Sequence, residues 1–246
     1  MVLGLVMVLV GTALLLRPKV NEYIQEKQAE EEINEFFVEY WGGTIQNAED
    51  VKNGVYRSIT NPHALSLFPE LYQAMQEYNE TIYGNGQEGI SDPWAYQVSA
   101  MDLSRFGLED KPIGVLTIPK MKFQQPIYVG ATSKHLNDGV AQIAISSMPI
   151  GGVNTNCVIA GHRGWNGAPY MRYIDVLEPG DIIVVTNFWK SMIYEVKEIM
   201  VIEPYEAEKI MIQPDRDLVT ILTCHPYGSG GRFRYLVFCE RVEDAP

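Results

Sequence analysis

Three side chains that can do chemistry together stand near the ends of strand-like runs in the C-terminal half of the chain. Cys224 closes the run "LVTILTC", His162 closes "NCVIAGH", and Arg234 opens "FRYLVFCER" after its first residue. A thiol with an ordinary pKa of about 8.5 is only a few per cent thiolate at neutral pH. A nearby imidazolium or guanidinium would raise that fraction, and a histidine could protonate a leaving amine. The set is typical of acyl transfer through a cysteine nucleophile.

Each of the three residues also has an ordinary structural interpretation. Most cysteines outside disulfides are buried core residues, a single histidine is more often structural than catalytic, and an arginine in a strand is often a solvent-exposed charge. Their positions favour the functional alternative. Strand ends that meet loops are common catalytic positions, and a glycine-rich loop over residues 225–232 would return Arg234 beside Cys224 in an antiparallel hairpin.

Strand alternation makes specific predictions about the neighbouring residues. Successive side chains of a strand face opposite sides of the sheet. His225 should therefore point away from Cys224 and should not be the partner of that thiol. By the same alternation, Cys157 and Cys239 should point away from the face that carries His162 and Arg234, so we expect both to be packing residues.

Composition excludes several other functions. The 246 residues carry a net charge of −12 and no Lys/Arg cluster, which argues against nucleic-acid binding. The three cysteines form no CxxC pair, and the four histidines show no HExxH or Cys/His metal spacing. We therefore expect no metal site and no cofactor.

The first residues predict a membrane anchor. Residues 1–16 carry no charge, although they fall slightly short of the roughly 20 apolar residues that usually span a bilayer. Arg17, Pro18 and Lys19 follow directly, without a small-residue cleavage site. An uncleaved anchor over 1–17 is favoured, with a signal peptide or a buried helix as alternatives. The flanking positive charges determine its orientation only weakly.

The rest of the chain changes from helical to strand-like patterns. Residues 18–40 have apolar residues at near-helical spacing, 64–83 read as a second helix, and 84–94 read as a loop. From residue 113 short β-like runs alternate with turns, which predicts a mainly β barrel or sandwich. The expected layout is an anchor (1–17), a helical stem (18–83), a lid region (84–110) and a β domain (111–246).

These motifs together resemble the sortase family. The family's nucleophile motif T-L-x-T-C stands here as "TILTC" (220–224), its histidine follows a strand as in "VIAGHRG", and its arginine opens the last strand as in "RYLVFCER". The segments "IPKMKFQQPIYVGAT" and "LNDGVAQIAISSMPIGG" resemble the first half of the family's barrel. The resemblance covers nearly the whole chain and implies a sortase-type closed β-barrel with Cys224, His162 and Arg234 as catalytic residues.

The N-terminal half resembles class C, pilin-type sortases. "LLLRPKVNEYIQEKQ" is similar to their membrane-exit segment and "QEYN" to their N-terminal helix. Asp92, Pro93 and Trp94 look like their lid motif, although the same triplet alone would read as a helix N-cap followed by proline. The loop "HPYGSGG" departs from the family's class C pattern, which usually has an Asn between the cysteine and the arginine.

The resemblance implies a membrane-anchored cysteine transpeptidase on the outside of a Gram-positive bacterium. Cys224 would cleave the Thr–Gly bond of a Leu-Pro-x-Thr-Gly-like sorting signal, His162 would protonate the departing amine, and Arg234 would orient the substrate and stabilise the oxyanion. The acceptor amine would be a pilin lysine in pilus assembly, or a cell-wall precursor in a housekeeping-type enzyme. The alternative to an enzyme is a membrane-tethered, non-catalytic binding module.

Overall fold

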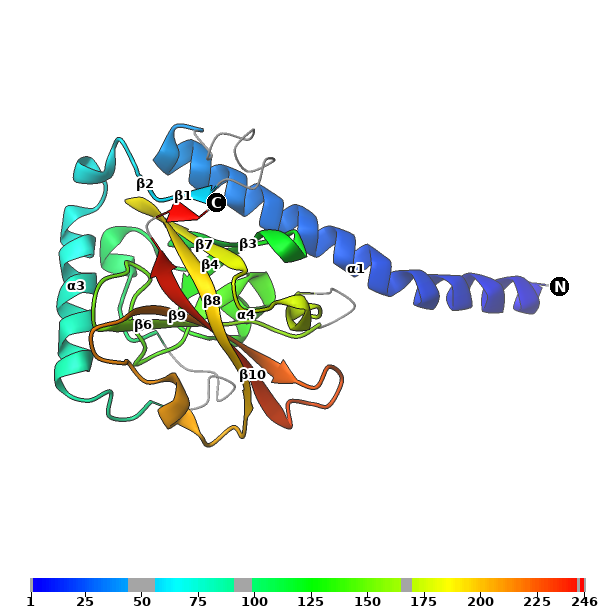
Figure 1. Cartoon of the computed structure of the whole chain (residues 1–246). Coiled ribbons are helices and arrows are strands. Elements are labelled where there is room, and N and C mark those ends of the chain that lie inside the picture. Colours follow the sequence, from blue (N-terminus) through cyan, green and yellow to red (C-terminus); the bar gives the residue numbers. More distant parts are fainter. Residues whose placement is uncertain (1, 44–55, 91–98, 165–169, 243, 246) are drawn as a thin grey trace.

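A computed structural model describes residues 2–43, 56–90, 99–164, 170–242 and 244–245 of the chain. Eight strands close into a barrel, in the order β10-β9-β6-β5-β4-β3-β7-β8 and back to β10 (Figure 1). Their bounds are β3 Gly114–Ile118, β4 Phe123–Val129, β5 Val140–Gln142, β6 Thr155–Ala160, β7 Ile182–Asn187, β8 Lys190–Ile202, β9 Asp217–His225 and β10 Phe233–Val242. The predicted mainly β, closed-barrel fold is confirmed.

Closure removes the open sheet edges that would otherwise be exposed. Most pairs in the ring are antiparallel, but β4 pairs with β5 and β6 pairs with β9 in parallel. Outside the ring, β2 (Ile59–Thr60) pairs with β8, and β1 (Tyr56–Arg57) pairs with β11 (Asp244–Ala245). The sequence predicted all the barrel strands except β5, which has only 3 residues and therefore shows little periodicity.

The central strands separate two core clusters by alternation. In β9, Val219 and Ile221 belong to the larger cluster and Leu222 to the second one. In β10, Val237 belongs to the larger cluster and Leu236 to the second. Both faces of these strands are therefore buried along most of their length, and only the strand ends can present side chains to a substrate.

The N-terminal helix α1 runs without interruption from Val2 to Trp41, with Pro18 inside it. Figure 1 shows its first half projecting from the barrel and its second half lying against it. In the second half Phe36 packs on Phe188, with ring centroids 5.4 Å apart, and the Trp41 indole donates to the Asn187 carbonyl at 2.9 Å. The expected anchor over 1–17 and the start of the expected stem therefore lie on one continuous helix. Among the described residues, no helix reaches the length and apolarity that a membrane crossing requires.

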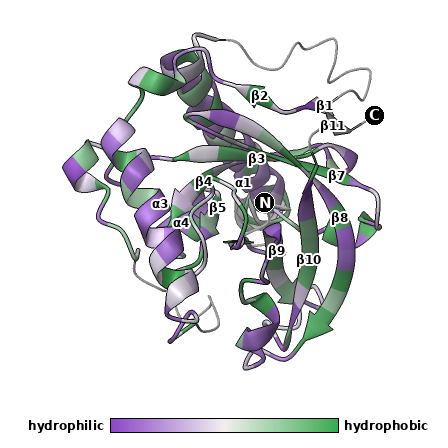
Figure 2. Cartoon of the chain, turned by 60° about the vertical axis from the view of Figure 1, so that its left-hand side comes forward, coloured by the Kyte–Doolittle hydropathy of each residue, from purple (hydrophilic) through white to green (hydrophobic). Residues whose placement is uncertain are grey.

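Helix α3 (Pro69–Gly84) braces the segment between β5 and β6. It begins later than the predicted residue 64, because Pro69 occupies its first turn and a short 3-10 helix, η1 (Ala64–Ser66), precedes it. Hydrophobic and hydrophilic bands alternate along it in Figure 2. On its buried side, Asn79 accepts a hydrogen bond from the Met148 amide at 2.7 Å, and the Tyr78 hydroxyl accepts from the Ile145 amide at 3.0 Å.

Short helical turns complete the described chain. They are α4 (Ser133–Asp138) and the 3-10 helices η3 (Ser104–Phe106), η4 (Pro119–Met121), η5 (Ile174–Val176) and η6 (Ala207–Ile210). The α4 helix is capped by the Thr132 hydroxyl, which accepts from the His135 amide at 3.1 Å. The His135 ring lies between the Gly130 carbonyl (2.8 Å) and the Asp110 carboxylate (3.2 Å) and stacks on Tyr128, so this histidine has a structural place.

Candidate active site

Cys224 and Arg234 are direct partners across the antiparallel pair of β9 and β10. Directly paired residues place their side chains on the same side of a sheet. Arg234 is only 5% exposed, and its Nη1 donates to the carbonyls of Gly231 at 2.6 Å and Phe233 at 3.1 Å. Cys224 is half-buried. The hairpin therefore places a fixed guanidinium on the same side as the thiol, as the sequence predicted.

Gly231 shows how closely these two groups approach. A Cβ atom added at Gly231 would lie 3.1 Å from Cys224 Sγ and 3.2 Å from Arg234 Nη1. Its backbone has φ +82°, a conformation that glycine adopts readily and other residues rarely do. The absence of a side chain at position 231 therefore leaves the space between the sulfur, the guanidinium and the turn backbone open.

His162 reaches the same edge of the barrel from β6. The parallel pairing of β6 with β9 ends at Ala160 opposite Leu222, and two further hydrogen bonds extend it. The Gly161 amide donates to the Leu222 carbonyl at 3.1 Å, and the Thr223 hydroxyl donates to the Gly161 carbonyl at 2.7 Å. Continuing this register by two residues brings His162 level with Cys224. The residue before the cysteine is thus tied to the residue before the histidine.

Burial determines the charge of His162. Removal from water lowers the pKa of the His162 imidazole to about 4. At pH 7 about one ring in a thousand would then be protonated. The imidazole level with the thiol is therefore neutral and can accept a proton, and the permanent positive charge of this edge comes from Arg234. The imidazolium considered at the sequence level is not the main resting form.

Tyr170 links the histidine to the elements around it. Its ring meets the His162 ring edge-on, with centroids 5.7 Å apart. Its hydroxyl lies 2.8 Å from the Asn137 carbonyl of α4 and 3.2 Å from the Gln25 side chain of α1. The imidazole thus packs against a tyrosine that is itself fixed by two helices.

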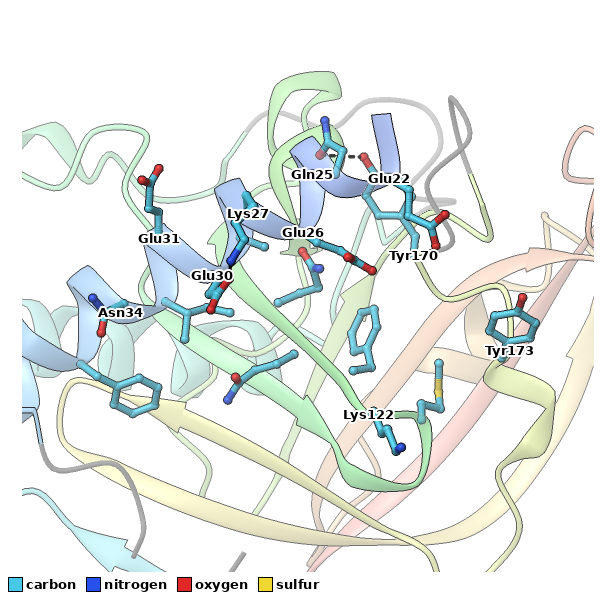
Figure 3. Close-up of a pocket in the computed structure, with 17 residues that line it drawn as sticks. Glu22, Gln25, Glu26, Lys27, Glu30, Glu31, Asn34, Lys122, Tyr170 and Tyr173 are labelled. Carbon is cyan, nitrogen blue, oxygen red and sulfur yellow. Dashed lines mark hydrogen bonds and ion pairs between the residues drawn. The ribbon is translucent and has the colours of Figure 1, made fainter. Parts of the chain in front are cut away.

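The cavity drawn in Figure 3 lies beside this edge, between α1 and β4, and has a volume of about 950 Å³. Glu22, Gln25 and Lys27 line it from α1, and Tyr170 and Tyr173 line it from the segment before and at the start of η5. The Gln25–Tyr170 contact is visible in the same view. The residues that line the cavity do not include Cys224, His162 or Arg234. Tyr170 connects the two places, because it lines the cavity and packs against His162.

His225 occupies the opposite side of the strand from Cys224, as alternation predicted. Its Nδ1 lies 2.7 Å from Nη1 of Arg163, and its ring stacks on Tyr235 with centroids 5.5 Å apart. Arg163 also forms an ion pair with Asp175 at 3.2 Å. These contacts hold His225 on the face away from the thiol.

The other two cysteines are packing residues, as predicted. Cys157 and Cys239 are buried in the larger core cluster, where removal from water raises the pKa of both thiols well above the usual value. Asp92, Pro93 and Trp94, the expected lid residues, lie outside the described residues. In the described part of the chain, no group of three His, Cys, Asp or Glu side chains could hold a metal ion.

Some residues of this site were missed at the sequence level. Thr223 stands inside the motif "TILTC", so its place next to the cysteine was a usable signal for a strand-to-strand hydrogen bond. Gly231 gave only a loop signal, since a glycine-rich sequence does not show which glycine faces a thiol. Arg163 gave none, because nothing in its sequence context indicates a buried guanidinium.

Comparison with known proteins agrees with this arrangement. A family model described as the sortase domain matches residues 116–242, and the chain belongs to the sortase family. Among solved structures, sortase C-1 of Actinomyces oris is 33% identical, with 71% of this chain and 99% of that chain covered and a TM-score of 0.60. Sortase C1 of GBS pilus island 1 is 27% identical, with 87% and 92% covered and a TM-score of 0.67.

Among curated proteins, Sortase SrtE1 of Streptomyces coelicolor is 31% identical over 146 residues, which is 54% of this chain. The chain spans 41% of the length of that relative. Pilin-type sortases are thus similar to this chain over more of its length than this curated relative is.

Proposed function

We propose that this protein is a membrane-anchored transpeptidase that cleaves a Leu-Pro-x-Thr-Gly-like sorting signal through Cys224. The observation that carries the proposal is the meeting of three strand ends at one edge. Cys224 lies opposite Arg234 in the hairpin, and the β6–β9 register brings His162 level with the thiol. A nucleophile, a proton carrier and an oxyanion donor are the groups that acyl transfer requires.

The first half-reaction uses the neutral imidazole of His162. As Cys224 Sγ attacks the threonine carbonyl carbon, His162 takes the thiol proton and becomes an imidazolium. Arg234 stabilises the developing oxyanion with its permanent charge. When the tetrahedral intermediate collapses, the C–N bond to glycine breaks and the imidazolium gives its proton to the departing amine. The products are a thioacyl enzyme, a neutral His162 and a free glycine-terminated fragment.

The second half-reaction reverses these roles. An acceptor amine attacks the thioacyl carbon, His162 takes its proton, and the C–S bond breaks to form an amide. The thiolate recovers the proton from the imidazolium. We favour a pilin lysine as the acceptor, because solved structures similar to this chain over 87% of its length include a sortase of a pilus island. A cell-wall precursor is the alternative acceptor of a housekeeping-type enzyme.

The proposal includes the layout expected from the sequence: an anchor over 1–17, a stem over 18–83, a lid region over 84–110 and a catalytic domain over 111–246. The protein would be held at the cell membrane by its N-terminal segment, with the catalytic domain outside. Its partners would be a sorting-signal-bearing protein and the amine that receives it.

The function is tested by product analysis with a donor peptide and an amine. Wild type should cut the peptide between threonine and glycine and, with a lysine-containing peptide present, should form a new amide detectable by mass. Cys224→Ala should do neither while keeping the wild-type melting temperature. Cleavage by Cys224→Ala at the wild-type rate would contradict the role of Cys224, and absence of cleavage by wild type would favour the non-catalytic binding module.

The lid proposal needs a separate comparison. Asp92 would pair with a guanidinium and Trp94 would cover the thiol, so replacing both by alanine should speed alkylation of Cys224 by a small thiol reagent. Leu65→Ala is a suitable control, because Leu65 is 98% exposed. Equal alkylation rates in wild type, the double variant and the control would show that "DPW" is only a helix start.

A further inference from the structure

A second group of three residues lies directly behind the candidate catalytic residues. Arg163 follows His162, His225 follows Cys224, and Tyr235 follows Arg234 in the sequence. Consecutive strand residues face opposite sides. In β9 and β10 the two groups therefore occupy opposite faces, and in the segment after β6 Arg163 is separated from His162 by one peptide unit.

The members of this second group contact one another across all three segments. Arg163 Nη1 lies 2.7 Å from His225 Nδ1, and its guanidinium lies 5.1 Å from the centre of the Tyr235 ring. The His225 ring stacks on the same tyrosine at 5.5 Å and 26°. The Arg163 Nη2 atom forms the outer contact, an ion pair of 3.2 Å with the exposed Asp175 of η5. Arg163 is 6% exposed, so this guanidinium is not a surface charge.

The contacts define the protonation state of His225. A guanidinium has only donors, so the Nδ1 atom of His225 must accept the bond and the ring proton must lie on Nε2. Protonation of Nδ1 would remove the bond and place two cations against each other. The groups acting on His225 are Arg163 from the segment after β6, Asp175 from η5 and Tyr235 from β10. Burial and the charge of Arg163 lower the pKa of His225, and Asp175 opposes them.

The location of the group indicates what it does. The parallel pairing of β6 and β9 ends with the bonds at Gly161, one residue before His162. A further link between these two segments is the Arg163–His225 hydrogen bond, one residue after His162 and Cys224. Tyr235 joins the third segment to the same tie. The histidine and the cysteine are therefore held from both sides along the chain.

We propose that Arg163, His225 and Tyr235 form a positioning cluster that fixes His162, Cys224 and Arg234 relative to one another, and that it does so only while His225 is neutral. The proposal rests on the proposed transpeptidase function. His225 and Tyr235 lie on the faces of β9 and β10 away from Cys224 and Arg234, and Arg163 contacts them there, so the three are positioning residues. A misplacement of about 1 Å in such a site can cost about a hundredfold in rate, which sets the scale of the expected effect.

The first test compares three variants by the kcat and KM of donor-peptide cleavage. Arg163→Gln should lower kcat by about 10- to 100-fold with little change in KM, because positioning acts on the reacting groups and not on the peptide. His225→Asn should keep kcat near wild type at pH 7, since its Oδ1 atom can accept from Arg163 where Nδ1 did. Arg172→Gln is the matched control: its guanidinium lies over Tyr227 at 4.6 Å, and the contact of Arg163 with position 172 is to the backbone carbonyl at 3.5 Å, which the substitution keeps, so kcat should be unchanged.

The pH profile separates positioning from a general loss of stability. As the pH falls through the pKa of His225, wild type should lose kcat, whereas His225→Asn has no group to protonate at this position and should keep kcat until His162 itself takes up a proton, near its pKa of about 4. An unchanged acid limb in His225→Asn, or a wild-type kcat in Arg163→Gln, would overturn the proposal. If Arg163→Gln fails to fold, the pH profile of His225→Asn tests the proposal by itself.

A third measurement does not depend on activity. In ¹⁵N-labelled protein at pH 7, the His225 ring should show an unprotonated Nδ1 and a protonated Nε2, and Arg163→Gln should raise the pKa of His225. A ring protonated on Nδ1 would overturn the cluster even in an active enzyme. If wild type cleaves no donor peptide but the ring behaves as expected, the cluster exists and the proposed function is at fault.

Discussion

At the residue scale, the site depends on a glycine, Gly231, that lies close to both the thiol and the guanidinium. The position of the missing Gly231 side chain lies 3.1 Å from the sulfur and 3.2 Å from Arg234 Nη1. Both distances are shorter than ordinary van der Waals contacts with a carbon atom. A methyl group there would therefore have to displace either the nucleophile or the cation.

Gly231→Ala should accordingly lower activity by more than it lowers stability. The new Cβ would press on both groups, and the residue would be held at a φ of +82° that alanine rarely adopts. We expect a drop in kcat of about tenfold or more and a loss of about 1–2 kcal/mol in unfolding free energy. Gly230→Ala is the control, because its φ is +71° and no atom lies within 4 Å of its added Cβ. Equal kcat values for the two variants would contradict this account.

Arg234→Lys should fail to restore activity. Lysine keeps the charge but loses the planar fork, and Arg234 uses its Nη1 to bond the Gly231 and Phe233 carbonyls while the charge faces the site. Losing an oxyanion donor costs about 10²- to 10³-fold in kcat in comparable sites. The exposed neighbour Arg232 serves as the control in Arg232→Lys. A turnover of Arg234→Lys close to wild type would mean that a positive charge alone is enough.

At the element scale, the β6–β9 pairing determines where the histidine stands relative to the cysteine. Two threonines of β9 bond to β6 or to the residue after it. Thr223 donates to the Gly161 carbonyl at 2.7 Å, beside the site, and Thr220 donates to Asn156 at 2.8 Å, four residues before the cysteine. They offer a matched pair of substitutions with different distances from the reacting groups.

Both Thr223→Val and Thr220→Val should lose about 1–3 kcal/mol of stability, because each leaves a buried acceptor without its bond. Only Thr223→Val should also lower kcat, since its bond fixes the residue before His162. Denaturant unfolding and steady-state cleavage of the donor peptide measure the two effects. An equal fall in kcat for both variants would show that the effect follows stability and not position.

Much of the arrangement of the strands could be predicted from the sequence. The alternation in "LVTILTC" and "FRYLVFCER" correctly placed Cys224 and Arg234 on one face and His225 on the other, because side-chain period is a local property of a strand. The start of α3 could not be predicted from apolar spacing alone, since Pro69 sets it. The sequence also could not predict the register between β6 and β9 or the burial of Arg163. Both depend on partners more than 60 residues away, such as the Arg163–His225 pair.

At the scale of the whole molecule, two half-buried histidines make stability depend on pH. Burial lowers the pKa of His162 from an ordinary 6.5 to about 4, and burial with Arg163 lowers that of His225. Near pH 6.5 the two histidines therefore bind protons in the unfolded chain but remain largely unprotonated in the folded chain. Stability should fall as the pH drops from about 6.5 towards 4.

Thermal unfolding of wild type and His162→Gln at several pH values between 7 and 4.5 tests this. Glutamine cannot take up a proton, so the variant should lose less melting temperature across this range than wild type. The carboxylates are the same in both proteins, and their titration cancels in the comparison. Parallel melting curves across the whole range would show that the His162 ring is not protected from protonation.

The central claim is that Cys224 carries the acyl group, and trapping that intermediate tests it most directly. Wild-type protein is mixed with a Leu-Pro-x-Thr-Gly-like peptide in the absence of an amine acceptor, quenched in acid and digested. The masses of its three cysteine-containing peptides are then measured by mass spectrometry. The account predicts that the mass of the acyl fragment appears on the Cys224 peptide alone and is removed by hydroxylamine. An adduct on the peptide of Cys157 or Cys239, or cleavage without any adduct, would contradict it.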